Sequence, residues 1–367
     1  MRVISIVGAR PQFVKLAPFS RELRKYHEET IIHTGQHYDT NMSELFFKQL
    51  DIPEPDINLH IGSGGHGAQT GKMLSALEEQ FINLSPDAVV VFGDTNSTLA
   101  GALAASKLHI PCIHIEAGLR SFNRLMPEEI NRVVADHTCD LLMAPTRTGM
   151  NNLCNEGLEQ CSIFTGDIMV DAVQYLADKA EHESRILEKN GLQEKSYYLL
   201  TLHRPSNVDN AEQLRYILAQ LENLDQPVIF PVHPRTRRFL PESVENIQFI
   251  DPVGYIDIIS LQRNALKVIT DSGGMQKEAY VLGTPCITLR KETEWVETVE
   301  AGWNLLLNPA GDILCKQIQS FSANGKQPDI FGNDVAARMV KELGRIESVP
   351  SRRVIINVKE DYAKPSF

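Results

Sequence analysis

The stretch RVISIVGARPQFVKLAP (residues 2–18) combines the three parts of a strand–turn–helix unit. Val3–Val7 is a short apolar run without alternation, which is typical of a parallel strand buried on both faces. Gly8 ends this run, and the following Ala-Arg-Pro can open a helix. Arg10 and Lys15 bring two cations to the start of that helix, where they would favour a bound anion over a merely solvated turn. The stretch therefore predicts an α/β fold with a ligand site after its first strand.

Units of this kind recur along the whole chain and fall into two series. Each short apolar run is followed by a loop and a helical pattern, as in proteins that alternate strands and helices. The charged helical stretch Val170–Asn190 separates the two series. The predicted strands are Val3–Val7, Thr30–His33, Ala88–Phe92, Cys112–Ile115 and Leu141–Met143 in the first series, and Tyr197–Leu202, Val228–Val232, Ile247–Ile250, Val268–Thr270 and Cys286–Leu289 in the second.

The two series predict two Rossmann-like domains whose parallel sheets face a cleft. We place the first domain at residues 1–170 and the second at 171–346, and we expect the tail 347–367 to pack on the first. In open parallel sheets, ligands bind outside the carboxyl ends of the strands, where the strand order reverses. The ligand is therefore expected between the two domains.

Composition and charge limit the kinds of partner. A chain of 367 residues is long enough for two hydrophobic cores. Its formal net charge of −11 and pI of about 5.5 argue against nucleic acid or an anionic membrane as the main partner. No run approaches the ~18 apolar residues of a membrane span. The six scattered cysteines favour reduced thiols in a cytoplasmic protein.

A second anion motif, DSGGMQKE (271–278), follows a strand of the second series. Ser272, Gly273 and Gly274 would let backbone N–H groups approach a phosphate at a helix start, although many ordinary turns contain two glycines. Glu278, about one turn into that helix, could accept hydrogen bonds from ribose hydroxyls. Neither glycine motif is a dinucleotide fingerprint or a P-loop, so neither NAD nor ATP hydrolysis is predicted.

Three carboxylates of the first series lie at strand ends or at a helix start. Asp94 and Glu116 directly follow strands, and Glu128 follows a proline at a predicted helix start. Asp94 could instead be an ordinary helix cap, and Glu128 could simply oppose a helix dipole. Several carboxylates in one cleft could push their pKa values apart and supply an acid and a base.

Cationic side chains follow strands of the second series. His203 and Arg204 come after one strand and His233 after the next, where they suit phosphate or leaving-group oxygens. The segment Arg290–Trp295 follows a further strand and is expected to line the same cleft. We expect His114 and His137 to be packed or capping histidines without a functional role.

Together these motifs resemble the non-hydrolysing UDP-N-acetylglucosamine 2-epimerases, which have the two-domain glycosyltransferase-B architecture. The resemblance runs from Arg2 to about Gly344. It rests on GARPQFVKLAP (8–18), TGQHYD (34–39), FGDTNST (92–98), HIEAGLRS (114–121), MPEEINR (126–132), HR (203–204), DSGGMQKEA (271–279) and LRKETEW (289–295).

The resemblance implies inversion at C2 of a UDP-N-acetylhexosamine by anti elimination of UDP and its re-addition, for surface polysaccharide synthesis. It implies no cofactor and no metal, and family members are usually homodimers. By motif, Asp94, Glu116 and Glu128 match the essential carboxylates and His203 the essential histidine, with acid and base left unassigned. The implied UDP or substrate contacts are Arg10, Lys15, Arg132, Arg204, His233, Tyr255, Ser272, Gly273, Gly274, Glu278, Arg290 and Glu294.

Two departures from the best-known members concern the sugar. The chain has Glu294-Trp295 within a motif that usually reads TERPE, and its segment RSFNRLMPEEINR (120–132) resembles the branch acting on UDP-2,3-diacetamido-2,3-dideoxyglucuronate. Arg120, Arg124 and Trp295 are candidate donors for the extra groups of that sugar. A glycosyltransferase of the same fold, a hydrolysing epimerase and a non-catalytic UDP-sugar sensor are the alternative functions.

Overall fold

The computed structural model describes residues 1–36, 50–232, 234–311, 313–323 and 325–348, and the chain folds into two compact units. Unit 1 is Met1–Ala172 together with the chain from Phe331 onward, and unit 2 is Val173–Ile330. Each unit contains one sheet in which all neighbouring strands are parallel. The predicted α/β fold with two parallel-sheet domains is confirmed.

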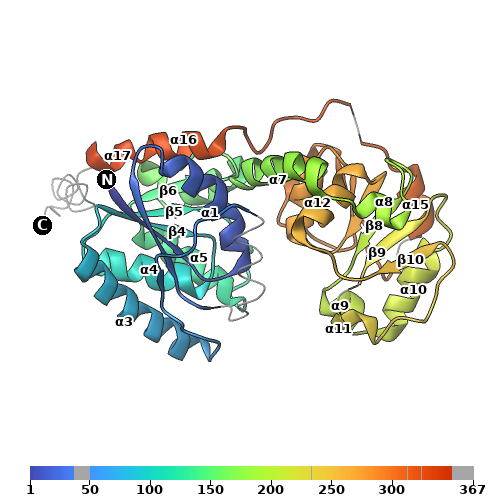
Figure 1. Ribbon diagram of the computed structural model, residues 1–367, viewed down its shortest axis with the longest axis horizontal. Coiled ribbons are helices and arrows are strands. Elements are labelled where there is room, and N and C mark those ends of the chain that lie inside the picture. The colour runs from blue at the N-terminus through green and yellow to red at the C-terminus, as the bar shows by residue number, and fades with distance from the viewer. Residues whose placement is uncertain (37–49, 233, 312, 324, 349–367) are drawn as a thin grey trace, which may run out of the picture. The chain divides into compact units, whose positions relative to one another are not determined.

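Unit 1 has a seven-stranded sheet in which the order reverses between β1 and β4. Helices α3, α4 and α5 pack side by side on one face, and α1 and α16 on the other (Figure 1). In sheet order, the strands are β3 (Ile57–Asn58), β2 (Glu28–His33), β1 (Arg2–Val7), β4 (Ala88–Phe92), β5 (Cys112–Ile115), β6 (Leu141–Ala144) and β7 (Ser162–Phe164). The helices are α1 (Arg10–Leu23), α3 (His66–Leu84), α4 (Asn96–Lys107), α5 (Pro127–Thr138), α6 (Arg147–Asn155), α16 (Val335–Glu342) and α17 (Gly344–Ser348), with α7 (Met169–Glu183) beginning here.

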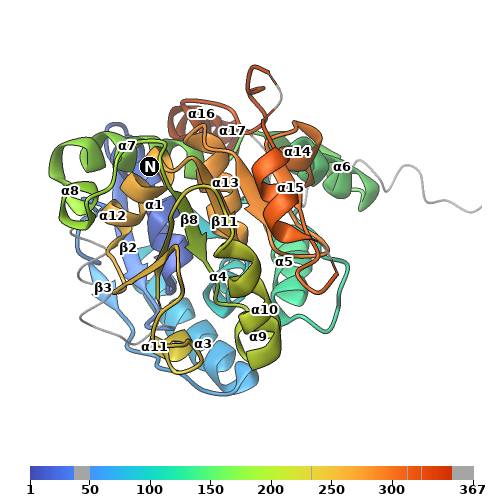
Figure 2. The ribbon, with the colours of Figure 1, turned by 90° about the vertical axis from the view of Figure 1, so that its right-hand side faces the viewer.

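Unit 2 has a six-stranded sheet in which the order reverses between β8 and β11. Helix α12 packs against α8 and α13, and α10 packs against α9 and α15 (Figure 2). In sheet order, the strands are β10 (Ile247–Ile250), β9 (Val228–Pro231), β8 (Tyr198–Thr201), β11 (Lys267–Thr270), β12 (Cys286–Thr288) and β13 (Asn304–Leu306). The helices are α8 (Ile186–Asn190), α9 (Pro205–Val208), α10 (Ala211–Leu221), α11 (Pro234–Arg237), α12 (Tyr255–Asn264), α13 (Gly273–Val281), α14 (Val296–Glu300) and α15 (Leu314–Ser320).

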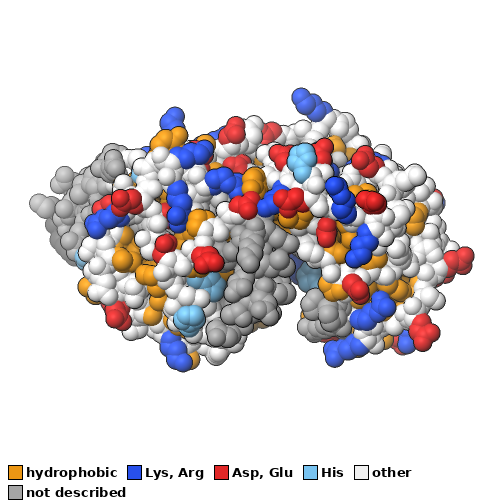
Figure 3. Space-filling view, in the orientation of Figure 1, with side chains coloured by type: hydrophobic (Ala, Val, Ile, Leu, Met, Phe, Trp, Pro, Cys, Tyr) orange, Lys and Arg blue, Asp and Glu red, His pale blue; other side chains and the backbone are white. Residues whose placement is uncertain are grey.

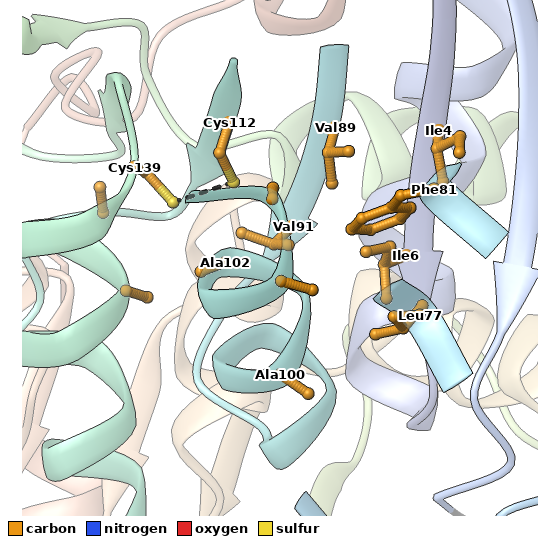
Figure 4. Packing of buried hydrophobic residues seen from close by; sticks show 14 of the residues in the cluster. Ile4, Ile6, Leu77, Phe81, Val89, Val91, Ala100, Ala102, Cys112 and Cys139 are labelled. Atoms are coloured by element: carbon orange, nitrogen blue, oxygen red, sulfur yellow. Dashed lines mark hydrogen bonds between the residues drawn. The ribbon is translucent and has the colours of Figure 1, made fainter. Parts of the chain in front are cut away.

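The core of unit 1 shows why α4 can lie close to the central strands. Ile6 of β1 and Val91 of β4 are fully buried, and Phe81 of α3 packs in the same cluster (Figure 4). Helix α4 contributes Ala100 and Ala102 to this cluster, and a Cβ atom on its Gly101 would lie 2.6 Å from Ile6 Cδ1 and 2.9 Å from Val91 Cγ1. Small side chains permit a close helix–sheet approach at the density of a protein interior. This packing fixes the end of β4, which the site uses.

The last helices of the chain belong to unit 1. The carboxylate of Asp171 accepts hydrogen bonds from the backbone N–H groups of Val335 (3.1 Å) and Ala336 (2.7 Å), at the start of α16. Helix α16 then packs against α1. The second unit consequently ends at Ile330, earlier than the expected 346. Most of the expected tail 347–367 lies outside the described residues.

Charged side chains of both signs lie on the surface (Figure 3), and the cysteines are not bridged. On the face shown in Figure 3, acidic and basic side chains are intermixed rather than gathered by sign. All six cysteines are free thiols, and the sulfur atoms of Cys112 and Cys139 lie 3.2 Å apart in the core (Figure 4). Among the described residues, no helix is both long and apolar enough to span a membrane.

Candidate functional site

The turn after β1 is tied to the end of β4 by one buried amide. Gln12 accepts hydrogen bonds from the backbone N–H groups of Gly8 (2.8 Å) and Ala9 (3.0 Å), and donates to the carbonyl of Phe92 (2.8 Å). This amide holds together the two strand ends at which the sheet order reverses, where α/β sheets bind ligands. Sequence reasoning missed Gln12. Arg10 begins α1, and its side chain lies outside what the structure describes.

Lys15 and Glu116 form a short ion pair at the same place, and each side chain is only 10% exposed. Glu116 has a backbone φ of +74°, a conformation that costs a non-glycine residue ~1–3 kcal/mol and that clusters at functional sites. Gly93, with φ of +62°, makes room for the pair. A Cβ atom on Gly93 would lie 3.2 Å from Lys15 Nζ and 3.3 Å from Glu116 Oε2.

Asp94 directly follows Gly93 and pairs with a cation from α5. Its Oδ2 accepts hydrogen bonds from Arg132 Nε (3.0 Å) and Nη2 (2.6 Å). The Nη1 atom of Arg132 donates to Glu129 Oε2 at 2.9 Å. Two of the predicted carboxylates, Asp94 and Glu116, therefore lie at the ends of neighbouring strands, each with its own cationic partner.

The adjacent residues Glu128 and Glu129 have different surroundings in the first turn of α5. Glu129 is buried and accepts hydrogen bonds from the N–H groups of Ser121 (2.8 Å) and Phe122 (2.9 Å). Burial works to raise the pKa of Glu129, but these bonds and Arg132 outweigh it and lower the pKa. Glu128 is exposed and pairs with no described residue. Glu129 thus holds the preceding loop, and Glu128 is available to a ligand.

Arg120 is not a donor for the sugar, contrary to the expectation. Its side chain is 1% exposed and forms two hydrogen bonds of 2.7 Å with Glu156 and an ion pair of 2.7 Å with Asp136. Burial alone would lower the pKa of Arg120, but these two carboxylates raise it further above its already high ordinary value. Arg124, by contrast, is exposed.

In unit 2, a buried aspartate organises the loop after β8. Asp271 accepts hydrogen bonds from the backbone N–H groups of His203 (3.1 Å) and Arg204 (3.1 Å), and from Asn207 Nδ2 (3.0 Å). Its Oδ1 also lies 3.1 Å from His203 Nδ1. Burial alone would raise the pKa of Asp271, but these partners lower it. The His203 side chain remains 57% exposed, so its other ring nitrogen can face a ligand.

The start of α13 lies beside the loop after β12. Ser272 is the N-cap residue, and its hydroxyl makes no capping bond. A Cβ on Gly273 would lie 2.4 Å from Glu294 Oε1, so a larger residue there would displace the Glu294 side chain. Glu294 in turn accepts a 2.8 Å hydrogen bond from Arg290 and lies 4.0 Å from Arg204. Gly274 is exposed at the helix start, as expected for a phosphate contact.

Tyr255, an implied UDP contact, and Glu278, the expected ribose contact, form a hydrogen-bonded pair. Tyr255 donates its hydroxyl to Glu278 Oε1 (2.7 Å), and Gln262 donates to Glu278 Oε2 (2.7 Å). Burial raises the pKa of Glu278, and the two hydrogen bonds oppose that rise. Burial and the facing carboxylate also raise the pKa of Tyr255. Glu278 therefore carries two protein hydrogen bonds that sequence reasoning did not foresee.

Two further expected residues have different outcomes. His233 lies outside the described residues. Trp295 is buried, and the ammonium of Lys277 lies 4.0 Å from the centre of its ring, so the tryptophan packs over a cation within unit 2.

Comparison with known proteins shows the family to which the chain is similar. The UDP-N-acetylglucosamine 2-epimerase family matches residues 21–343. A Methanococcus maripaludis protein named as a UDP-N-acetylglucosamine 2-epimerase homolog is 50% identical over 331 residues, covering 88% of this chain and 93% of that protein. The UDP-2,3-diacetamido-2,3-dideoxy-D-glucuronate 2-epimerase of Pseudomonas aeruginosa is 44% identical over 355 residues, covering 93% and 99%.

A solved structure extends the match to three dimensions. The crystal structure of the Methanocaldococcus jannaschii UDP-GlcNAc 2-epimerase, in complex with UDP-GlcNAc and UDP, has a TM-score of 0.81 and 44% identity, covering 94% of this chain and all of that one. The resemblance of the motifs to this family is confirmed. This chain belongs to the UDP-N-acetylglucosamine 2-epimerase family.

Proposed function

We propose that this chain is a UDP-sugar 2-epimerase, an isomerase that inverts C2 of a UDP-N-acetylhexosamine without net hydrolysis. The observation that carries the proposal is the carboxylate set of unit 1. Asp94 and Glu116 lie at the ends of neighbouring strands, each with a cationic partner. Glu128 is exposed in the first turn of α5. An acid and a base on the two faces of C2 are what such an inversion requires.

The reaction would proceed by elimination and re-addition of UDP. A carboxylate removes the C2 proton, the C–H electrons form the C1–C2 double bond, and the C1–O bond breaks with its electron pair on the β-phosphate oxygen. UDP then re-adds at C1, and a proton returns to the opposite face of C2. The carboxylates Asp94, Glu116 and Glu128 share the two proton transfers in this proposal, with Arg132 and Lys15 fixing the first two.

Residues of unit 2 would hold UDP while it is free. The N-terminus of α13, with Ser272, Gly273 and Gly274, suits a diphosphate because its N–H groups point outward and its dipole favours an anion. His203 and Arg204, anchored by Asp271, suit the leaving oxygen. Electrostatic stabilisation of a departing diphosphate is the largest part that a protein can play in such a step.

Incubation with UDP-N-acetylglucosamine in heavy water tests the proposal. We expect deuterium at C2, formation of the manno epimer and no need for an acceptor. Accumulation of free UDP and free N-acetylmannosamine would instead indicate a hydrolysing epimerase. Sugar transfer to an acceptor with C2 hydrogen retained would indicate a glycosyltransferase, and binding without turnover would indicate a sensor.

A second candidate substrate is UDP-2,3-diacetamido-2,3-dideoxyglucuronate. It is supported by the 44% identity to the Pseudomonas aeruginosa enzyme named for it and by the segment 120–132. With Arg120 buried in ion pairs, Arg124 is the exposed arginine of that segment that could contact a C5 carboxylate. Assay of both sugars with wild-type protein and with Arg124→Ala distinguishes the two candidate substrates. If Arg124→Ala loses turnover of the uronate only, Arg124 is the contact for its carboxylate and the uronate is a substrate.

The proposal includes the setting of the enzyme. We propose that the chain forms a homodimer in the cytoplasm and supplies an epimerised sugar for surface polysaccharide, as the resemblance to the family implies. Light scattering of the purified chain tests the oligomeric state, because a monomer mass at all concentrations would remove the homodimer from the proposal.

A further inference from the structure

His114, expected to have no role, lies between the two loops that carry Asp94 and Glu116. It is the third residue of β5 and is fully buried. Its Nε2 lies 2.7 Å from the carbonyl oxygen of Gly93, the residue before Asp94. Its Nδ1 lies 2.6 Å from Asp136 Oδ1 on α5. The His114 ring therefore contacts the loop after β4, and its own backbone in β5 lies two residues before Glu116.

The partners of the two ring nitrogens determine its protonation. A backbone carbonyl can only accept a hydrogen bond. Asp136 is also an acceptor here, because its Oδ2 receives the N–H of Gly118 (3.0 Å) and pairs with Arg120 (2.7 Å). Burial would raise the pKa of Asp136, but the facing His114 and Arg120 lower it, which keeps the carboxylate ionised. Both nitrogens of His114 must therefore donate, and the ring is an imidazolium.

The surrounding charges fit this assignment. The network contains the carboxylates of Asp136 and the partly exposed Glu156, and the permanent cation Arg120. The half-exposed ring of His137 also lies 3.8 Å from Glu156. Arg120 is shared between the two carboxylates, so a charged His114 supplies a second positive charge beside the fully buried Asp136. Two further ion pairs lie by the loop that accepts from the ring: Lys15–Glu116 beside Gly93, and Asp94–Arg132 at the next residue.

We propose that His114 is a positioning residue, a buried imidazolium that holds the loops of Asp94 and Glu116 in fixed relation. It donates to the carbonyl of Gly93 and to Asp136, and Asp136 in turn accepts the N–H of Gly118. Gly118, with φ of +82°, follows Glu116 by two residues, so Asp136 anchors the second loop while His114 anchors the first. The proposal rests on the proposed function in one respect, namely that these two carboxylates transfer the protons.

Two isosteric substitutions separate the two hydrogen bonds. The amide nitrogen of glutamine replaces Nε2, so His114→Gln keeps the bond to Gly93. The amide nitrogen of asparagine replaces Nδ1, so His114→Asn keeps only the bond to Asp136. We expect kcat to fall ~10-fold in His114→Gln and ~100-fold in His114→Asn, because a displacement near 1 Å at reacting groups costs about that much. KM should change less than about twofold, since the residues proposed to hold the diphosphate, Ser272, Gly273 and Gly274, lie in unit 2.

The matched control is His182→Gln, at the exposed end of α7, which should leave kcat unchanged. Melting temperatures and UDP binding of every variant report the folded fraction. The positioning role is wrong if folded His114→Gln and His114→Asn both keep the wild-type kcat. It is also wrong if the kcat of His114→Gln is no higher than the kcat of His114→Asn.

The protonation is measured independently of turnover by ¹⁵N–¹H NMR of the imidazole nitrogens. We expect one ring to carry protons on both nitrogens in the folded enzyme, because both nitrogens face acceptors. That signal should become neutral in Asp136→Asn, whose amide donates to Nδ1 while its oxygen keeps the bond to Gly118. A ring that is neutral in the wild-type enzyme at pH ~7.5 overturns the proposal. Failure of the proposed function would appear separately, as no deuterium at C2 in wild-type enzyme.

Discussion

Gly93→Ala should reduce turnover more than it reduces stability, because the added methyl group meets the Lys15–Glu116 pair. An alanine at φ of +62° costs ~1–2 kcal/mol relative to glycine. Its Cβ would lie 3.2 Å and 3.3 Å from the two charged groups, closer than the ~3.5–4.0 Å of comfortable contact. The pair must therefore move by a few tenths of an ångström.

The stability cost corresponds to a fall in Tm of roughly 2–8 °C for a unit of this size. We expect kcat to fall ~10-fold, since displacement of reacting groups by less than 1 Å lies below the ~100-fold cost of a full ångström. Thermal denaturation and the deuterium exchange assay at C2 measure the two effects separately.

Gly157→Ala is the matched control, because Gly157 has φ of +76° and no atom within 4 Å of an added Cβ. It lies at the end of α6, outside the proposed site. Both variants should lose similar Tm, and only Gly93→Ala should lose turnover. Equal kcat in the two variants would refute the reasoning that Gly93 makes room for the ion pair.

Three further predictions concern single carboxylates. Asp271→Asn weakens the acceptor shared by the backbone N–H groups of His203 and Arg204, so kcat/KM should fall at least ~10-fold. Wild-type kinetics in this variant would show that Asp271 does not position the loop. Glu129→Gln should lower the free energy of unfolding, measured in urea, by ~1–3 kcal/mol, whereas Glu128→Gln should keep wild-type stability and lose turnover. A stable Glu129→Gln beside a destabilised, active Glu128→Gln would contradict the two roles. The lowered pKa values of Glu129 and Asp271 predict stability that is present above pH ~4, where the unfolded groups are ionised, and lost as pH falls through the lower folded values. Urea unfolding between pH ~5 and ~2 should show this loss. The free energy of unfolding should depend less steeply on pH in Asp271→Asn than in the wild type.

Much of the fold follows from local sequence pattern. The buried parallel strands appear as continuous apolar runs, and each run predicted from the sequence corresponds to a strand of the structure. The short strands β3, β7 and β13 were not predicted. They lie at or beside sheet edges, where two or three residues leave no distinguishable apolar run.

The place of the last helices could not be inferred from local pattern. Helix α16 looks like the closing helix of the second domain, because it follows that domain in the chain. Asp171 and α1 of unit 1 bind it instead, and such long-range pairing leaves no local trace.

The sequence by itself determined the type of fold, the strand ends at which ligand residues gather, and the family, because periodicity and motif spacing are local properties. Only the tertiary structure decided which of two adjacent glutamates is buried, that Arg120 is engaged in ion pairs, and that Asp271 and His114 hold the loops. Burial and partner choice depend on residues distant in the chain. The opening unit, residues 2–18, illustrates both levels: its strand and helix follow from composition, whereas the pairing of Lys15 with Glu116 required the folded sheet.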